Sequence, residues 1–297
     1  MRIEPLGEQF VATATGVDLR AASDADVAAF RAALFRYKVV VAPGQALEAA
    51  EYHAFMRRLG VPVPHVLAQF SLPALRDVLI VSNVYDGAGR PIGVHEGGAY
   101  WHADMSYLAA NRVLTSLYAL EVPAEGGRTH FVDCEVGPAG ADFAALLREL
   151  ELGETATVRH RFGNRARARD AGAAFQRLDD DQAAALPEVR HPLLHAHPYA
   201  GTRALYAVAG TAVALDERSE AESLPLLDAL EAFLLARHAR YEHRYAPGDL
   251  VVWDNLSTLH SGESIAPAAS PGTRRLLLRM NADYSRRVQP SSSSAAR

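Results

Sequence analysis

The chain has 297 residues, of which 49% are hydrophobic and 22% charged, and its formal net charge is −5. This is the composition of an ordinary globular protein, and it excludes collagen-like, low-complexity and wholly disordered chains. An acidic balance gives no support for a nucleic-acid-binding protein, and no run of eighteen apolar residues predicts a membrane span. We therefore expect a small-molecule partner and neither nucleic acid nor a membrane.

Cys134 is the only cysteine, so an internal disulfide is impossible and a reducing compartment is favoured. The opening sequence MRIEPLGEQF lacks the charged and apolar regions of a signal peptide, and we expect a cytoplasmic protein. No repeat or linker divides the chain. We expect a single domain over residues 1–287 and a disordered polar tail over 288–297, which contains the run PSSSSAAR.

The predicted elements begin with a short strand within residues 10–19, where apolar and β-branched residues precede a turn. Ser23 and Asp26 have the spacing of an N-cap pair, and the apolar residues that follow predict a helix over 24–36. The apolar run at 38–42 then predicts a buried strand, which ends at a Pro-Gly turn.

Further along the chain, helices are predicted over 46–59 and 226–238, and strands over 78–81, 114–120 and 275–283. The segments 240–244 and 250–253 flank a Pro-Gly-Asp turn and predict a hairpin. Helices are concentrated early, and strands dominate later. The pattern favours an α+β protein built on a largely antiparallel sheet or barrel.

His102 and Asp104, within AYWHADMSY, have the spacing of a pair of metal ligands. On a strand, residues two apart point to the same face, so the imidazole and the carboxylate would converge. Alone the pair is weak, because a chain of this composition contains roughly 0.7 such matches by chance. A solvated strand end without a metal is the alternative.

His260 strengthens the metal hypothesis, because it ends the segment PGDLVVWDNLSTLHSG after an apolar strand. Together with His102 and Asp104 it completes a set of two histidines and one carboxylate. Such a set forms the facial triad of non-haem Fe(II) oxygenases, which leaves coordination positions open. Zn²⁺ hydrolases also use two histidines and a carboxylate, so the ligands alone leave the metal undecided.

Two arginines follow in the run RRLLLR. On a strand, Arg275 and Arg279 share one face, whereas Arg274 points away. An arginine beside a metal site offers a bidentate fork to a carboxylate. The alternative is a solvated edge strand with its charges turned outward.

These motifs together resemble the TauD/TfdA family of Fe(II)- and 2-oxoglutarate-dependent dioxygenases. The resembling segments are WHAD, the WDN segment that ends at His260, RRLLLR, the opening PLG…ATGVDL, VVVAPGQALEAAEYHAFMRRLG and EVPAEGGRTHFVD, and they cover about residues 1–285. The resemblance implies a distorted double-stranded β-helix (a cupin-like jelly-roll) flanked by helices.

The resemblance also implies roles. His102, Asp104 and His260 would be the Fe(II) ligands, and no catalytic residue beyond them is implied. Arg275, helped by the hydroxyl of Thr129, would bind the distal carboxylate of 2-oxoglutarate. Because the metal-binding carboxylate is present, hydroxylation is expected rather than halogenation. O₂ would be the oxidant, and succinate and CO₂ would be products.

Substrate residues are less clearly marked. Arg279 matches a family position that can hold an anionic group. Tyr100, Tyr107 and His95 surround the first two ligands and are candidate contacts, and His65 is a further one. Both tyrosines could instead pack as amphipathic core residues. We expect a small carboxylate- or amino-acid-like substrate.

One departure from the family pattern concerns the interval between His260 and Arg275, which is longer than typical. The stretch APAASPG at 266–272 has the composition of a loop insertion that would absorb the difference. Alternative functions are desaturation or cyclisation of a natural-product intermediate, a jelly-roll Zn²⁺ hydrolase, or a non-catalytic binding protein. A homo-oligomer is compatible with the resemblance.

Overall fold

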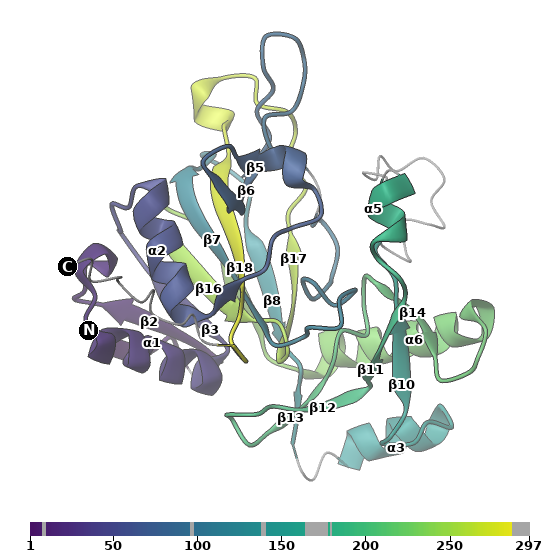
Figure 1. Ribbon diagram of the computed structural model, residues 1–297. Coiled ribbons are helices and arrows are strands. Elements are labelled where there is room, and N and C mark those ends of the chain that lie inside the picture. The colour runs from purple at the N-terminus through teal and green to yellow at the C-terminus, as the bar shows by residue number, and fades with distance from the viewer. Residues whose placement is uncertain (8–9, 96–97, 138–140, 164–177, 179, 287–297) are drawn as a thin grey trace, which may run out of the picture.

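The computed structural model describes residues 1–7, 10–95, 98–137, 141–163, 178 and 180–286. The tail expected over 288–297 lies outside these residues. The chain forms a mixed α/β fold in which helices lie on the outside of large sheets (Figure 1). Within the described ranges, no helix is both long and apolar enough to cross a membrane.

The first half of the chain contains most of the large sheet and the two helices that cover it. Its elements are β1 (Arg2–Pro5), β2 (Val11–Thr15), a 3-10 turn (Leu19–Ala21), α1 (Asp24–Tyr37), β3 (Val39–Ala42), α2 (Ala49–Leu59), β4 (Val61–Pro62), a 3-10 turn (Ala68–Phe70), β5 (Ser71–Leu72), β6 (Leu75–Ser82), β7 (Val113–Glu121), β8 (Thr129–Asp133), β9 (Glu135–Val136) and α3 (Ala141–Glu149).

The second half supplies the strands that complete the sheets. Its elements are β10 (Thr157–His160), α5 (Asp180–Ala184), β11 (Val189–Pro192), β12 (Leu194–Ala196), β13 (Arg203–Leu205), β14 (Ala212–Leu215), α6 (Glu220–Arg237), β15 (Arg240–His243), β16 (Leu250–Asp254), β17 (Thr258–Gly262), a 3-10 turn (Pro271–Thr273) and β18 (Leu276–Asp283).

The N-cap expected before the first long helix is confirmed, because Ser23 and Asp26 form a reciprocal capping box at the start of α1. The helix predicted over 226–238 begins earlier than expected, at Glu220. Ser219 and Glu222 form a second capping box there, and Pro225 lies inside the helix. The capping residues, not the proline, therefore define this helix start.

The hairpin predicted across the Pro-Gly-Asp turn is wrong. β15 pairs with β8 in a small sheet, whereas β16 pairs with β3 and β7 in the large one. The turn at residues 247–249 thus moves the chain from one sheet to the other. The strand expected within 10–19 ends at Thr15.

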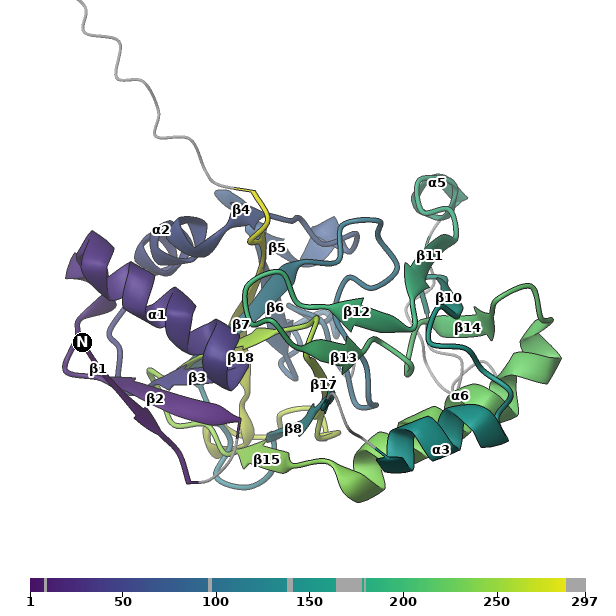
Figure 2. The ribbon, with the colours of Figure 1, turned by 90° about the horizontal axis from the view of Figure 1, so that it is seen from below.

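The large sheet has the strand order β1-β2-β3-β16-β7-β18-β6-β5, with β4 paired to β18, and is mostly antiparallel. Both of its faces are covered, which explains why β3 is a continuous apolar run. Val40 and Ala42 pack with α1 and α2, whereas Val39 and Val41 face the opposite way, toward Phe131 of β8. Figure 2 shows the two helices on the outer side of this sheet.

A small sheet with the order β15-β8-β17 lies against the inner face of the large one. Phe131 of β8 contacts Trp253 of β16 edge-to-face, with ring centroids 5.3 Å apart. A second core lies beside it, where α3 and α6 pack with strands β9, β13 and β14. The space between the large and small sheets is only partly filled, and it holds the candidate site.

Lys38 joins the end of α1 to the small sheet. It adopts a left-handed φ of 65° after the helix, and its backbone N–H donates to the Leu34 carbonyl. Its ammonium lies 2.8 Å from Asp133 and 2.5 Å from Glu135, and its side chain is 8% exposed. Burial by itself lowers the pKa of Lys38, but the two carboxylates outweigh it and raise the pKa above its usual value.

Candidate active site

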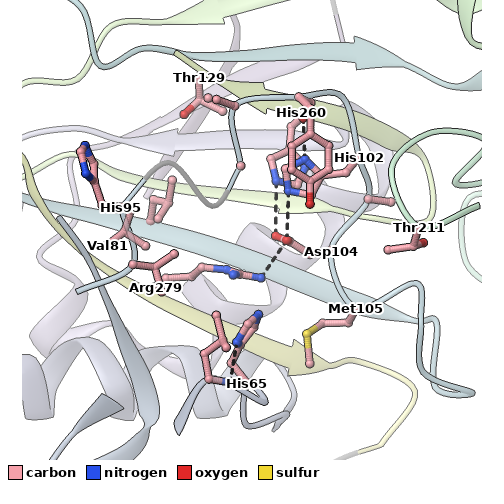
Figure 3. A pocket seen from close by; sticks show the side chains of 18 of the residues that line it. His65, Val81, His95, His102, Asp104, Met105, Thr129, Thr211, His260 and Arg279 are labelled. Atoms are coloured by element: carbon pink, nitrogen blue, oxygen red, sulfur yellow. Dashed lines mark hydrogen bonds and ion pairs between the residues drawn. The ribbon is translucent and has the colours of Figure 1, made fainter. Parts of the chain in front are cut away.

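Three polar side chains meet in the cavity between the two sheets. His260 lies on β17, and His102 pairs with it through reciprocal backbone hydrogen bonds of 2.9 Å. Nitrogen or oxygen atoms of His102, Asp104 and His260 lie within 4.8 Å of one another, and all three residues are buried. Figure 3 shows both imidazoles directed at the carboxylate.

Residues 102–104 do not form a strand, although the side chains of His102 and Asp104 converge. The chain turns directly after the bridge at His102, and Met105 adopts a left-handed φ of 60°. The turn brings Asp104 back under His102, and their Nε2 and Oδ1 atoms are 3.4 Å apart. Convergence therefore comes from a turn instead of from strand periodicity.

Asn255 holds this turn in place, and both the oxygen and the nitrogen of its side-chain amide form hydrogen bonds. Its Oδ1 accepts hydrogen bonds from the backbone N–H of Asp104 at 2.9 Å and from Trp253 Nε1 at 3.2 Å. Its Nδ2 donates to the Val113 carbonyl at 3.0 Å and to the Thr115 hydroxyl at 2.7 Å. Because Asn255 is 1% exposed, water cannot replace these partners.

The surroundings of the two imidazoles favour their neutral, metal-binding forms in different ways. His102 Nδ1 lies 2.7 Å from the Tyr100 carbonyl, which can only accept, so Nδ1 carries the hydrogen and Nε2 offers a lone pair. Burial lowers the pKa of His260 to about 4, and the neighbouring His102 acts in the same direction. His260 is thus neutral at pH 7, as a metal-binding imidazole must be.

Asp104 is held as a carboxylate. Burial by itself raises its pKa, but the charge of Arg279 and the nearby histidines outweigh burial and hold the pKa well below its usual range. Arg279 Nη2 lies 2.8 Å from Oδ1. Oδ2 is buried and has no hydrogen bond among the described residues. One oxygen is therefore engaged by the arginine, and the other faces His260 at 3.4 Å.

Gly210 leaves the space that the His102 side chain occupies. It has a φ of 63°, and a β-carbon at this position would lie 2.8 Å from the His102 Cβ and 3.2 Å from the Tyr100 ring. Both the backbone conformation and the contact exclude a larger residue without a shift of the histidine.

Arg275 lies one residue before β18 and lines the same cavity, with Thr129 at the start of β8. Burial lowers the pKa of Arg275, and its Nε has no hydrogen-bond partner in the described part of the chain. The Thr129 hydroxyl lies 3.1 Å from the Tyr245 hydroxyl. Arg274 points away from the cavity, as expected, and pairs with Glu121.

Arg279 and His65 form a second polar group in the cavity. Arg279 Nη2 also lies 3.4 Å from Asn281 Oδ1, and its Nε is buried without a partner in the described residues. Burial lowers the pKa of His65 to about 3, and the charge of Arg279 adds to this effect. His65 Nδ1 accepts the Leu67 N–H at 3.1 Å, so its hydrogen is on Nε2.

The two candidate tyrosines both line the cavity and both pack against other rings. Tyr107 is 6% exposed and meets Phe162 edge-to-face at 5.0 Å. Burial raises its pKa, so the hydroxyl stays protonated. The Tyr100 ring lies 4.7 Å from that of His102.

His95 lines the cavity, but both of its ring nitrogens are already used. Nε2 lies 2.8 Å from the Ile265 carbonyl, so it carries the hydrogen and donates. Nδ1 then accepts from the Tyr85 hydroxyl at 2.8 Å. The structure therefore leaves this side chain no free polar atom for a ligand.

The cavity that contains these residues has a volume of about 150 Å³. Its polar groups lie around Asp104, Arg275 and Arg279, and the rest of its wall is largely apolar. The apolar lining includes Leu67, Val81, Val94, Met105, Tyr107, Leu117 and Phe162. The site thus combines a cationic end with an apolar body.

Asn255, Gly210 and Asn83 were not predicted from the sequence, because their roles depend on contacts with distant parts of the chain. Asn255 lies in the WDN segment, and an asparagine after an apolar strand was the only signal for it. The Asn83 side chain accepts a hydrogen bond from the backbone N–H of Arg275 at 2.7 Å.

A solved structure shares the fold of this chain. A large mixed α/β fold with a small sheet against its inner face encloses two histidines, a carboxylate and two arginines. A structure titled AAD-2 in complex with Mn(II) and N-oxalylglycine has this fold, with a TM-score of 0.74 and 23% sequence identity. The match covers 97% of this chain and 99% of that one.

The family follows from the sequence comparison. The family described as Taurine catabolism dioxygenase TauD, TfdA family, matches residues 2–281, and the chain belongs to it. A relative from Sphingobium herbicidovorans, named (S)-phenoxypropionate/alpha-ketoglutarate-dioxygenase, is 32% identical over 87% of this chain and 88% of its own. Pentalenolactone F synthase of Streptomyces arenae is 30% identical over 80% of both chains.

These comparisons confirm the expected resemblance and the enzyme class. The chain is a member of a dioxygenase family whose relatives include 2-oxoglutarate-dependent enzymes acting on small molecules. A metal and 2-oxoglutarate are the cofactors that the family implies.

Proposed function

We propose that the protein is an Fe(II)- and 2-oxoglutarate-dependent dioxygenase that hydroxylates a small carboxylate, with the sheets forming a distorted double-stranded β-helix around the site. His102, Asp104 and His260 hold the metal, Arg275 and Thr129 bind the distal carboxylate of 2-oxoglutarate, and the substrate lies beside Arg279. Bound Fe(II) and 2-oxoglutarate supply the activation of O₂, with release of succinate and CO₂.

The donor set fits a divalent metal. The two imidazoles face the two oxygens of one buried carboxylate, His102 toward Oδ1 and His260 toward Oδ2. Oδ2 lacks a hydrogen bond in the described chain. A buried carboxylate oxygen in this state is costly unless a cation completes its environment. Three ligands on one side leave positions open for 2-oxoglutarate, which favours iron over a closed structural zinc site.

The observation that carries the proposal is Arg275, a half-buried residue whose Nε is buried without a hydrogen-bond partner in the described residues. Its guanidinium faces the cavity, and the groups that act on its pKa from nearby are Tyr245 and Glu263. A cation buried without a bidentate carboxylate partner is unfavourable, and a bound dicarboxylate would remove that cost. A zinc hydrolase has no evident use for this arginine, and the complete set of two histidines and a carboxylate disfavours a non-catalytic binding protein.

The substrate end of the cavity combines Arg279 and the Nε2–H of His65 with an apolar wall. Two donors at one end suit a carboxylate, and the apolar lining suits a non-polar body, such as an aryloxy group. The relative named for phenoxypropionate supports a carboxylate of this kind. An amino-acid-like substrate would leave its ammonium beside Arg279, which is unfavourable.

A second outcome for the same chemistry is desaturation or cyclisation of a natural-product intermediate. The pentalenolactone F synthase relative favours it, because that protein is named as a synthase. The apolar wall accommodates such a substrate as readily as an aryl carboxylate.

The test is anaerobic loading with Fe(II) and 2-oxoglutarate, followed by the visible spectrum. The proposal expects a metal-to-ligand charge-transfer band in the parent protein and its loss in His102→Ala. The same sample is then given O₂ with a panel of aryloxy carboxylates, aliphatic carboxylates and amino acids, and succinate is measured. Absence of the band in folded protein would overturn the cofactor assignment. Succinate release with amino acids alone would overturn the substrate assignment.

A further inference from the structure

Asn83 follows β6 directly and connects three parts of the backbone near Arg275. Its Oδ1 accepts the Arg275 N–H at 2.7 Å, and its Nδ2 donates to the carbonyls of Ala266 and Thr273 at 2.8 and 2.9 Å. The residue is 1% exposed. The amide therefore has no water to replace these partners, and each hydrogen bond is fixed in one direction.

The position of Asn83 in the sheet explains its importance. The ladder between β6 and β18 ends at the pair Ser82–Leu276, so Arg275 is the first residue beyond it. Its backbone is held by the side chains of Ser82 and Asn83, since the Ser82 hydroxyl donates to the Arg275 carbonyl at 2.9 Å and Asn83 Oδ1 accepts the Arg275 N–H. The Asn83 N–H adds a longer main-chain hydrogen bond of 3.4 Å to the same carbonyl. The direction in which the guanidinium leaves the strand thus depends on these side-chain contacts.

Asn83 also closes the loop insertion recognised in the sequence. Ala266 is the first residue of the stretch 266–272 and Thr273 directly follows it, and both carbonyls accept hydrogen bonds from the same amide. A backbone hydrogen bond from Ala268 N–H to the Asn83 carbonyl, 2.9 Å long, adds a further contact. In Figure 1 this loop stands beside the loop that follows β6, above the large sheet.

His95 provides a second anchor for the same loop. Its Nε2–H donates to the Ile265 carbonyl at 2.8 Å, and the Tyr85 hydroxyl fixes its other nitrogen. Tyr85 and His95 lie on the segment that follows Asn83. The two segments are therefore joined at residues 265, 266, 273 and 275, on one side of the cavity.

We propose that Asn83 is the positioning residue for Arg275, and that His95 supports it by fixing the start of the insertion. This inference rests on the proposed function of Arg275 in binding the distal carboxylate of 2-oxoglutarate. Asn83 acts through the backbone of Arg275 and touches neither the metal nor its ligands. Removal of the Asn83 amide should therefore weaken the binding of the distal carboxylate by Arg275 and leave metal binding unchanged.

The test measures ligand binding instead of turnover. Mn(II)-loaded protein is titrated calorimetrically with N-oxalylglycine, which has a distal carboxylate, and with 2-oxobutyrate, which lacks one. Asn83→Ala is expected to raise the Kd for N-oxalylglycine about tenfold or more, because the arginine backbone loses its fixed partner. The Kd values for 2-oxobutyrate and for Mn(II) should stay at the parent values.

Three further variants make the result decisive. Ser270→Ala, an exposed change on the same loop, should behave as the parent. His95→Phe should raise the N-oxalylglycine Kd by a smaller factor, and it tests the inference even if Asn83→Ala does not fold. Arg275→Ala tests the underlying assignment. If it leaves N-oxalylglycine binding unchanged, the role proposed for Arg275 fails.

If Arg275→Ala weakens binding but neither Asn83→Ala nor His95→Phe does, the positioning role alone is overturned. An equal loss for 2-oxobutyrate or for Mn(II) in Asn83→Ala would also overturn it, because general damage to the site would then explain the effect.

Discussion

Gly210 packs directly behind His102, in a backbone conformation that residues with a β-carbon rarely adopt. An added β-carbon at this position would meet the Cβ of His102, the Tyr100 ring and the Trp101 carbonyl. A residue with no side chain therefore leaves the room in which His102 lies.

The prediction is that Gly210→Ala weakens Mn(II) binding by about tenfold or more, because the new methyl group would lie 2.8 Å from the His102 Cβ. Mn(II) affinity is measured by titration. Gly201→Ala is the matched control, since Gly201 has a similar φ of 71° with nothing within 4 Å of an added β-carbon. Equal losses in the two variants would show that backbone strain alone is responsible.

At this scale the sequence indicated the candidate metal ligands and the charged residues of the cavity, but not the residues that hold them in place. His102, Asp104 and His260 were proposed from residue type and spacing, and the structure places them together. Asn255 acts through hydrogen bonds to main-chain and side-chain atoms, most of them distant in the sequence, and Gly210 acts through its contact with the His102 Cβ. Such contacts leave no periodic signal in the sequence.

At the scale of elements, α6 begins with a reciprocal capping box. The Ser219 hydroxyl accepts the Glu222 N–H, and the Glu222 carboxylate accepts the Ser219 N–H at 2.9 Å. The helix supplies Leu227, Leu230 and Leu234 to the core beside the small sheet. Its first turn is exposed, so the cap has to satisfy the free N–H groups.

We predict that Ser219→Ala lowers the free energy of unfolding by about 1 kcal/mol, the usual cost of losing an N-cap oxygen. Urea denaturation followed by circular dichroism measures the change. Ser219→Thr retains a hydroxyl at the same position and should lose much less. If threonine costs as much as alanine, the cap does not contribute in this way.

The positions of the long helices and strands could be predicted from the sequence, but the pairing of the strands could not. The helix α1 and the strands β7 and β18 have strong periodicity, and their positions follow the sequence closely. The hairpin failed because alternation shows which residues face a core but not which strand lies alongside. β15 and β16 are near in sequence, yet each finds a different sheet.

At the scale of the whole molecule, enclosing the site has an electrostatic cost. His65 is neutral in the folded protein with a pKa of about 3, lowered chiefly by burial and then by Arg279. In the unfolded chain the same group binds a proton near pH 6.5. Between these values the unfolded state holds more protons, so the stability of the fold falls as the pH falls.

The prediction concerns metal-free protein, and its measurement is urea unfolding at pH 7.0 and 4.5. The parent should lose about 2 to 3 kcal/mol more than His65→Asn over this interval, because asparagine does not titrate but can still accept the Leu67 N–H. Parallel losses in the two proteins would mean that His65 takes up its proton without unfolding.

Lys38 gives the molecule an unusual property. It is the only lysine in the chain, and its carboxylate partners and position between α1 and β3 keep it out of solvent. A protease that cleaves only after lysine therefore has one target bond, which is accessible only when the helix and the central strand separate. The rate at which fragments 1–38 and 39–297 form thus reports how often the core opens, with no label attached.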